Sequence, residues 1–188
     1  MIMGHYAMAL VPHAKIKSFP LWGFLIISQL LDFVMLFLIA FGVESIVQNP
    51  EANQGMFAAT INMMYSHDIV PVIVIGLIVA GVLFVATKRQ DVAIWAFLLV
   101  IFHEVSDLLS GFSHNVFGPE TTQFGFDFYN SNVLLALAIE IIISMACVHY
   151  FFKIRKGEYT KKRRLMTYAV VVVPTLAFLI QNYFLIYG

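Results

Sequence analysis

The chain has 188 residues, and its 11 basic and 11 acidic residues give a formal net charge of zero. Apolar residues make up 61% and charged residues 12%, which is about half the charged fraction of an ordinary soluble domain. Together with a mean hydropathy of +0.86, this composition excludes a soluble globular protein and predicts one polytopic membrane domain over residues 1–188. The single cysteine excludes an intramolecular disulfide.

Several apolar runs are long enough to cross a bilayer, which requires about 20 residues in a helix. Helices are the expected structure because lipid offers no other partner to backbone N–H and C=O groups. The predicted spans are about 19–43, 69–87, 92–112, 132–152 and 165–187. The predicted fold class is therefore an all-α integral membrane protein with five transmembrane helices, the last containing Pro174 as a candidate kink.

Residues 3–14 are apolar but too short to span, and two interpretations stay open. The segment can lie flat as an interfacial helix. Alternatively, it can rise into the bundle as a re-entrant half-helix, which at 1.5 Å per residue would put His5 roughly 15 Å above Lys15.

All lysines and arginines fall in three groups along the chain. These groups are Lys15 and Lys17; Lys88 and Arg89; and Lys153, Arg155, Lys156, Lys161, Lys162, Arg163 and Arg164. The two other loops, 44–68 and 113–131, contain none. Because lysine and arginine mark the cytoplasmic side, we expect an inner-membrane protein whose first basic segment is cytoplasmic and whose C-terminus lies outside.

Ionisable residues inside the spans gather at one depth. His103 and Asp107 are one helical turn apart and share a face. Counting 1.5 Å per residue from the span ends places a larger set at the same level, in the outer half of the bilayer. That set is Asp32, His67, Asp68, His103, Asp107, His114 and Glu140. By contrast, we expect Glu44, Glu51 and Glu120 to be solvated loop charges.

Histidine with carboxylate and without cysteine is the ligand chemistry of Zn²⁺ or another hydrolytic divalent metal. A metal would also offset clustered negative charge that burial disfavours, and the number of candidates suits one or two ions. Simpler interpretations remain for single residues: hydrogen-bonded packing for a histidine, a protonated carboxyl for Asp32 or Glu140, and a helix cap for Asp68. Glu104 points about 100° away from His103 around the helix, as a nearby acid or base.

Seven short stretches resemble, in order and spacing, the motifs of the small bacterial membrane-bound metal-dependent hydrolases, a family likened to zinc-dependent phospholipase C. They are Gly4-His5-Tyr6-Ala7-Met8-Ala9-Leu10, Gln29-Leu30-Leu31-Asp32, Tyr65-Ser66-His67-Asp68, Phe102-His103-Glu104-Val105-Ser106-Asp107, Phe112-Ser113-His114, Gly125-Phe126-Asp127-Phe128-Tyr129-Asn130-Ser131 and Ala138-Ile139-Glu140. The resemblance covers residues 4 to about 152, so no motif supports the fifth span.

The resemblance implies a metal site formed by His5, Asp32, His67, His103, Asp107, His114 and Glu140. It also favours the half-helix, because only a rising segment brings His5 to the other ligands. This chain departs from the family at three positions: Asp68 replaces a serine, Glu104 replaces an apolar or aromatic residue, and His114 comes about three residues late.

The leading hypothesis is a metal-dependent membrane hydrolase of a lipid or lipid-linked phosphoester, with Glu104 or Asp68 taking the proton. One alternative is a proton- or cation-coupled transporter or channel, because buried Asp, Glu and His often carry ions. Another is a non-catalytic, metal-stabilised subunit of a membrane complex. The expected partners are the lipid bilayer, a lipid substrate and a second copy or partner subunit, but no nucleic acid.

Overall fold

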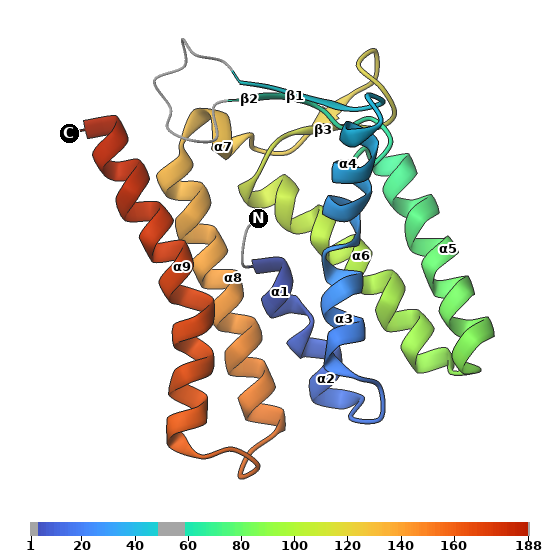
Figure 1. Cartoon of the computed structure of the whole chain (residues 1–188), viewed down its shortest axis with the longest axis vertical. Coiled ribbons are helices and arrows are strands. Elements are labelled where there is room, and N and C mark those ends of the chain that lie inside the picture. The colour runs from blue at the N-terminus through green and yellow to red at the C-terminus, as the bar shows by residue number, and fades with distance from the viewer. Residues whose placement is uncertain (1–3, 49–58, 188) are drawn as a thin grey trace.

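The computed structural model describes residues 4–48 and 59–187, and it is mostly helical. Four helices are long and apolar enough to cross a membrane. They are α5 (Ile69–Thr87), α6 (Gln90–Ser110), α8 (Val133–Ile154) and α9 (Lys161–Tyr187). They form two hairpins, α5–α6 and α8–α9, which flank the N-terminal helices (Figure 1).

The bounds of these helices follow from local sequence. Lys88 adopts the left-handed conformation (φ 55°), which ends α5 and turns the chain into α6. Helix α9 begins four residues before the predicted run because Oγ1 of Thr160 accepts a hydrogen bond from the Arg163 amide and caps the helix. Pro174 lies inside α9.

The first predicted span is broken. Its two parts, α3 (Leu21–Ser28) and α4 (Leu30–Ala40), are bent by 53° at Gln29. The described part of the chain therefore has four candidate spans, or five if the bent pair crosses as one. A break in an apolar helix leaves backbone N–H and C=O groups without their helical hydrogen bonds, so these groups need other partners. The carbonyl of Ser28 finds one in His103.

The N-terminal segment forms two short helices, α1 (Gly4–Met8) and α2 (Leu10–Lys15), which rise into the bundle between α3 and α8 (Figure 1). Ala9 and Met8 pack against Phe24 and Ile27 of α3. Leu10, with Ala7 and Ala14, packs against the aromatic end of α8. We call this packed α1–α2 segment the half-helix, and its small alanines permit the close approach.

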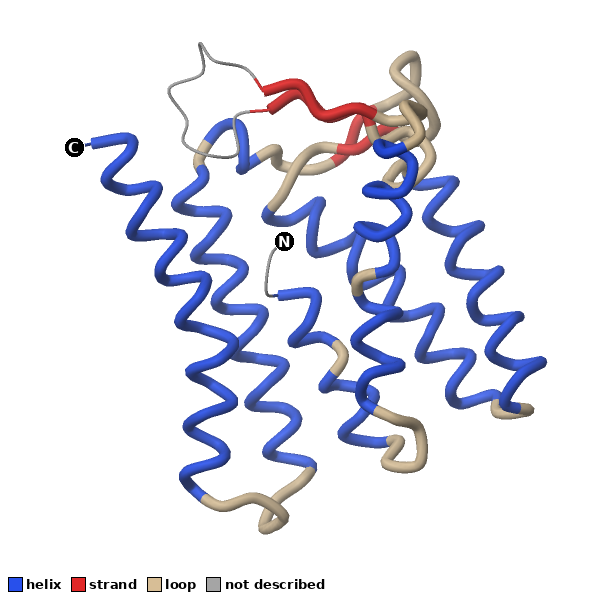
Figure 2. Tube along the Cα trace, in the orientation of Figure 1, coloured by secondary structure: helices blue, strands red, loops and turns tan. Residues whose placement is uncertain are grey.

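Two small antiparallel sheets and a short helix cover one end of the bundle (Figure 2). They are β1 (Ser45–Gln48) with β2 (Ala59–Asn62), β3 (His114–Asn115) with β4 (Gln123–Phe124), and α7 (Phe128–Ser131). The registers pair Ser45 with Asn62 and His114 with Phe124. The all-α prediction was therefore incomplete, because these strands are too short to leave a period-two pattern in the sequence.

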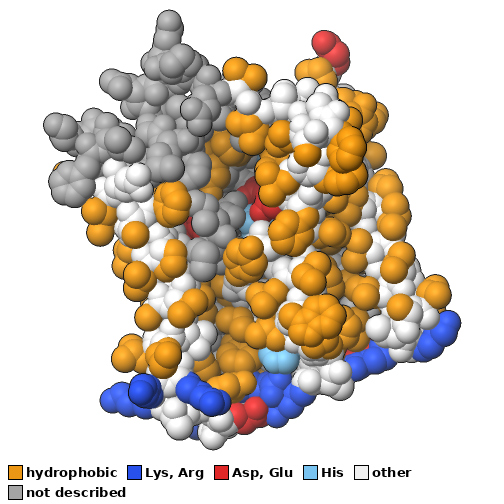
Figure 3. Space-filling model, viewed as in Figure 1, with side chains coloured by type: hydrophobic (Ala, Val, Ile, Leu, Met, Phe, Trp, Pro, Cys, Tyr) orange, Lys and Arg blue, Asp and Glu red, His pale blue; other side chains and the backbone are white. Residues whose placement is uncertain are grey.

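The surface separates charge by position. In Figure 3, lysine and arginine side chains gather at the end of the bundle opposite the sheets, and apolar side chains cover the flanks. Large side chains such as Trp22, Leu77 and Ile142 are 59–67% exposed. Between α4 and the α8–α9 pair, the same view shows a hollow with acidic and histidine side chains at its base.

Candidate metal centre

Five of the predicted ligands meet inside the bundle from four separate segments. His103 and Asp107 lie on α6, one turn apart, and both are buried. His5 reaches them from α1, and His67 from the turn that precedes α5. Asp32, in the first turn of α4 just after the break, is the most accessible, with 29% of its side chain exposed. We call these five residues the His/Asp cluster.

The cluster is defined by separations between imidazole Nε2 atoms and carboxylate oxygens. Asp107 places Oδ1 3.3 Å from Nε2 of His5 and Oδ2 3.3 Å from Nε2 of His103. Nε2 of His67 lies 3.9 Å from that second oxygen and 3.6 Å from Oδ1 of Asp32. The same Asp32 atom is 3.7 Å from Nε2 of His103. Two overlapping triads, His5–His103–Asp107 and Asp32–His67–His103, can each hold a metal ion.

These separations fit ligands around an ion better than direct ion pairs. A charge-assisted N–H···O bond is about 2.7–2.9 Å long. Donor atoms that share one tetrahedral Zn²⁺ at about 2.0–2.1 Å lie roughly 3.3 Å apart. In addition, Nε2 of His103 is buried and makes no well-aligned hydrogen bond within residues 4–48 and 59–187, although Oδ2 of Asp107 faces it at 3.3 Å. A buried nitrogen left in this state points to a missing ligand.

Each of the three imidazoles has its other nitrogen held by an oxygen. Nδ1 of His103 lies 2.7 Å from the Ser28 carbonyl, which can only accept, so this nitrogen carries the proton. Nδ1 of His67 lies 2.8 Å from Oγ of Ser66, and Nδ1 of His5 lies 3.3 Å from Oγ of Ser106.

The two serine hydroxyls donate elsewhere, Ser66 to a carboxylate of Glu44 and Ser106 to the His103 carbonyl. They therefore accept from the imidazoles. This fixes the tautomers so that the Nε2 lone pairs point into the cluster, as metal-ligating histidines require.

The break in the first span explains one of these supports. An unbroken helix would use the Ser28 carbonyl for its own backbone ladder. Because the chain bends at Gln29, this carbonyl is directed to the imidazole of His103 instead. The bend also turns α4 so that Asp32 faces His67 and His103.

Glu44 is not a solvated loop charge, and that prediction was wrong. Only 2% of Glu44 is exposed. Its Oε1 accepts hydrogen bonds from the amides of Tyr65 and Ser66, and its Oε2 accepts from the hydroxyl of Ser66. Glu44 therefore supports His67 through Ser66. Glu120 is exposed, as expected, and Glu51 lies outside the described residues.

Glu140 and His114 are buried next to the cluster but belong to neither triad. Oε1 of Glu140 accepts a hydrogen bond from the Gly4 amide at 3.1 Å, at the start of α1 and one residue before His5. Nδ1 of His114 lies 2.7 Å from Oε1 of Glu104, and its ring is 5.4 Å from that of His67. Burial alone lowers the pKa of His114, but the hydrogen bond and charge of Glu104 outweigh it, so the pKa is raised.

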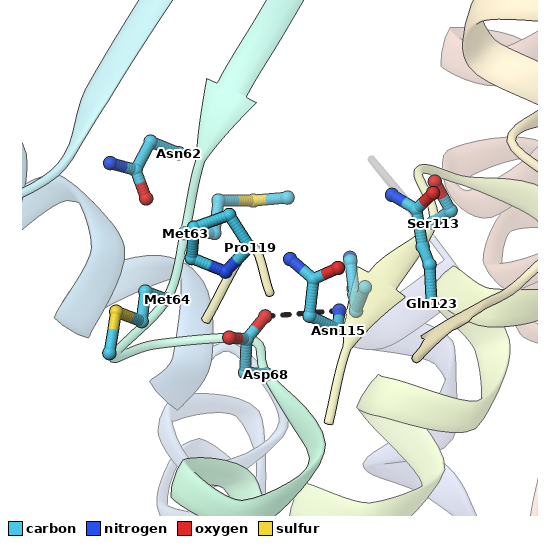
Figure 4. Close-up of a pocket in the computed structure, with 9 residues that line it drawn as sticks. Asn62, Met63, Met64, Asp68, Ser113, Asn115, Pro119 and Gln123 are labelled. Atoms are coloured by element: carbon cyan, nitrogen blue, oxygen red, sulfur yellow. Dashed lines mark hydrogen bonds between the residues drawn. The ribbon is translucent and has the colours of Figure 1, made fainter. Parts of the chain in front are cut away.

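Asp68 holds a hairpin. Its two oxygens accept hydrogen bonds from the amides of Asn115 (3.1 Å) and Gly118 (2.6 Å), and this fixes the β3–β4 hairpin over the start of α5. Figure 4 shows Asp68 and Asn115 at a cavity of about 200 Å³ that His114 also lines. Asp68 stands at the N-cap position of α5, but its side chain makes no capping bond.

The sequence prediction thus named the residues that converge, but it overlooked the groups that hold the three imidazoles through hydrogen bonds. Ser66 and Ser106 sit beside or between predicted ligands, so their positions were a usable signal. The Ser28 carbonyl and Glu44 left no such signal, because one is a backbone atom and the other is far along the chain. Comparison of the chain with protein-family models, curated proteins and solved structures finds no significant match to any of them.

Proposed function

We propose that this chain is an integral protein of the cytoplasmic (inner) membrane, with its basic end in the cytoplasm and the sheets outside. The four to five apolar helices, the exposed apolar flanks and the confinement of lysine and arginine to one end support this orientation. In this arrangement the His/Asp cluster lies in the outer half of the bilayer. The hollow above it, between α4 and the α8–α9 pair, faces lipid.

The His/Asp cluster is proposed to bind one or two divalent ions, with Zn²⁺ first because three imidazoles and two carboxylates without thiolate suit it. The two oxygens of Asp107 face different histidines, His5 and His103, so this carboxylate can serve one ion or bridge two. Asp32 is the most accessible member, with 29% of its side chain exposed.

The function that these features support best is hydrolysis of a lipid or lipid-linked phosphoester, as the resemblance to membrane-bound metal-dependent hydrolases implies. The observation that carries it is the buried His/Asp cluster, whose imidazole and carboxylate atoms have the spacing of metal ligands. A bound divalent ion would supply a more acidic water and polarise a phosphoryl oxygen.

The pair formed by Glu104 and His114 is the proposed proton acceptor. Oε2 of Glu104 is buried and has no hydrogen-bond partner within the described part of the chain. His114 stands between Glu104 and the cluster, because its ring is in contact distance of His67. Asp68 is assigned to hairpin placement, since both of its oxygens already accept backbone amides.

Packing below the cluster favours hydrolysis over transport. Most of the core between the cluster and the basic end is apolar, with Phe24, Ile27, Leu31, Leu99 and Val100 all buried and Gln29 and Ser144 as buried polar exceptions. An ion moving through this layer would lose its hydration and gain few polar ligands.

Metal content tests the first part of the proposal. Purified protein loaded with Zn²⁺ and desalted is expected to retain at least one equivalent by elemental analysis. The double substitution His103→Ala with Asp107→Ala is expected to abolish retention, and the matched substitution at an exposed histidine, His149→Ala, to leave it unchanged. Equal retention in all three proteins would rule out the cluster as the site.

Turnover tests the second part. Metal-loaded protein in nanodiscs is expected to release phosphate or a headgroup from phospholipid or lipid-linked phosphoester substrates. Glu104→Gln is expected to lower the rate by about 10²-fold or more while metal is retained. Retained metal with no turnover on any phosphoester would instead support the metal-stabilised subunit.

A further inference from the structure

An apolar groove of about 600 Å³ lies between the half-helix and α9, apart from the His/Asp cluster. Ala7 and Leu10 form its wall on the α1–α2 side, and Val170 and Val171 form its wall on α9. Leu25 of α3 also lines it. Within the proposed membrane arrangement, on which this inference rests, the groove opens to lipid and not to water.

The groove has one charged end. Arg163, in the first turn of α9, lines it at the basic end of the bundle, and Val170 lies two turns further along the same helix. That separation corresponds to roughly 10 Å of apolar depth. A phospholipid acyl chain whose headgroup sits at the basic end would extend in this direction.

The guanidinium of Arg163 is available for a ligand. It is exposed, and no side-chain hydrogen bond or ion pair engages it within residues 4–48 and 59–187. The nearby acid Glu158 is already used, because one of its oxygens accepts from Lys17 and the other from Arg155. Arg164 lies over the ring of Phe152, outside the groove.

We propose that the groove binds an anionic phospholipid of the cytoplasmic leaflet, with the phosphate at Arg163 and one acyl chain between α1–α2 and α9. Arginine matches phosphate geometry with paired donors, and the surrounding lysines and arginines favour an anionic headgroup over a zwitterionic one. The chain would pack on Ala7 and Leu10, next to the segment that carries His5. The bound lipid would therefore help to fix the half-helix in the bundle.

Lipid retention measures this directly. The protein is reconstituted in nanodiscs of equimolar phosphatidylglycerol and phosphatidylcholine, extracted in mild detergent, and analysed by native mass spectrometry. Wild-type protein is expected to keep one phosphatidylglycerol. Arg163→Gln is expected to reduce retention about tenfold, the loss of one charge-assisted contact, while the matched Lys162→Gln, which removes the same charge outside the groove, keeps it.

A second pair of variants tests the acyl-chain wall without changing charge. Val170→Trp fills the groove and is expected to expel the lipid, whereas Val173→Trp, on an exposed part of α9 outside the groove, is expected to retain it. Zn²⁺ content is measured in the same samples, so that loss of lipid with metal intact separates this inference from the proposed function.

Three outcomes would overturn the proposal. If Arg163→Gln and Lys162→Gln lose phosphatidylglycerol to the same extent, general surface charge and not a contact at Arg163 explains lipid retention. If the wild-type protein retains phosphatidylcholine as well as phosphatidylglycerol, Arg163 does not select an anionic headgroup. Cleavage of the retained lipid when metal is added would show that the groove holds the substrate and not a structural lipid.

Discussion

At the scale of single residues, His103 connects the features of the site. Its Nδ1 donates to a carbonyl released by the bend at Gln29, and its Nε2 is buried without a hydrogen bond among the described residues. A buried polar atom in this state costs about 1–3 kcal/mol. An ion shared with Asp107 and the other histidines would offset that cost, so metal binding and stability should be linked in this protein.

Glu44 should control metal affinity although it is not a ligand. Glu44→Gln removes the charge that orients Ser66 and so weakens the support of His67. Loss of such a support typically lowers metal affinity 10–100-fold, and we expect about this change in Zn²⁺ affinity measured by competition with a chelator. The exposed acid Glu120 offers a matched control, Glu120→Gln. Unchanged affinity in Glu44→Gln would mean that His67 is held by packing alone.

Glu140 allows a test between two roles, a metal ligand, as the resemblance implies, and an anchor for α1. Glu140→Ala should release the Gly4 amide, speed hydrogen exchange across residues 4–15 and weaken metal binding. Glu140→Gln keeps an acceptor oxygen but is a poor ligand, so we expect it to restore protection and metal binding to near wild type. If the glutamine variant loses metal as completely as the alanine variant, Glu140 is a ligand.

At the scale of elements, the half-helix is positioned from both ends. Glu140 anchors its start, and Arg155 donates to the carbonyls of His13 (2.6 Å) and Ala14 (3.0 Å) at the end of α2. Both residues belong to α8 or its C-cap, so α8 acts as the support along which α1 and α2 are fixed. Such anchoring explains how five-residue and six-residue helices, too short to be stable alone, hold His5 in place.

The anchor at the basic end should depend on pH. Hydrogen bonds from Lys17 and then Arg155 lower the pKa of Glu158 below its ordinary value of 4.5. A lowered folded-state pKa contributes stability above about pH 4.5, and that stability is lost as the pH falls through the folded pKa. We expect Glu158→Gln to lower the thermal midpoint at pH 7 and to match wild type at pH 3. A difference of equal size at both pH values would contradict a charge-based anchor.

At the scale of the whole molecule, charge and apolar surface define two ends and an apolar belt between them. The two small sheets and α7 cap one end, the basic loops form the other, and apolar side chains surround the flanks between them (Figures 2 and 3). Under the proposed function, the basic end lies in the cytoplasm and the capped end outside, because lysine and arginine mark the cytoplasmic side.

Orientation can be measured with single cysteines in a Cys147→Ala background. A cysteine placed at Glu120 should react with an impermeant maleimide in intact cells, whereas one placed at Lys156 should react only after permeabilisation. Both positions are exposed loop residues, so neither result depends on unfolding. The reverse pattern would invert the proposed topology.

Much of the architecture was predictable because apolar run length and periodicity are local properties. Helix α5 has the predicted bounds, and α6 and α8 differ from prediction by at most two residues at either end. The bend at Gln29 and the short strands were not predicted. No proline or glycine marks the bend, and the strand pairs join residues separated by a loop whose composition indicates no partner.

By itself, the sequence determined which helices form and that His103 and Asp107 share a face, because helical spacing places residues four apart side by side. It also determined that positive charge lies at one end. Only the tertiary structure decided that His5, Asp32 and His67 meet that pair, that Glu44 is buried behind His67, and that a free carbonyl orients His103. These features depend on how separate segments pack and on where a helix breaks. No fixed spacing of residues along the chain indicates either of them.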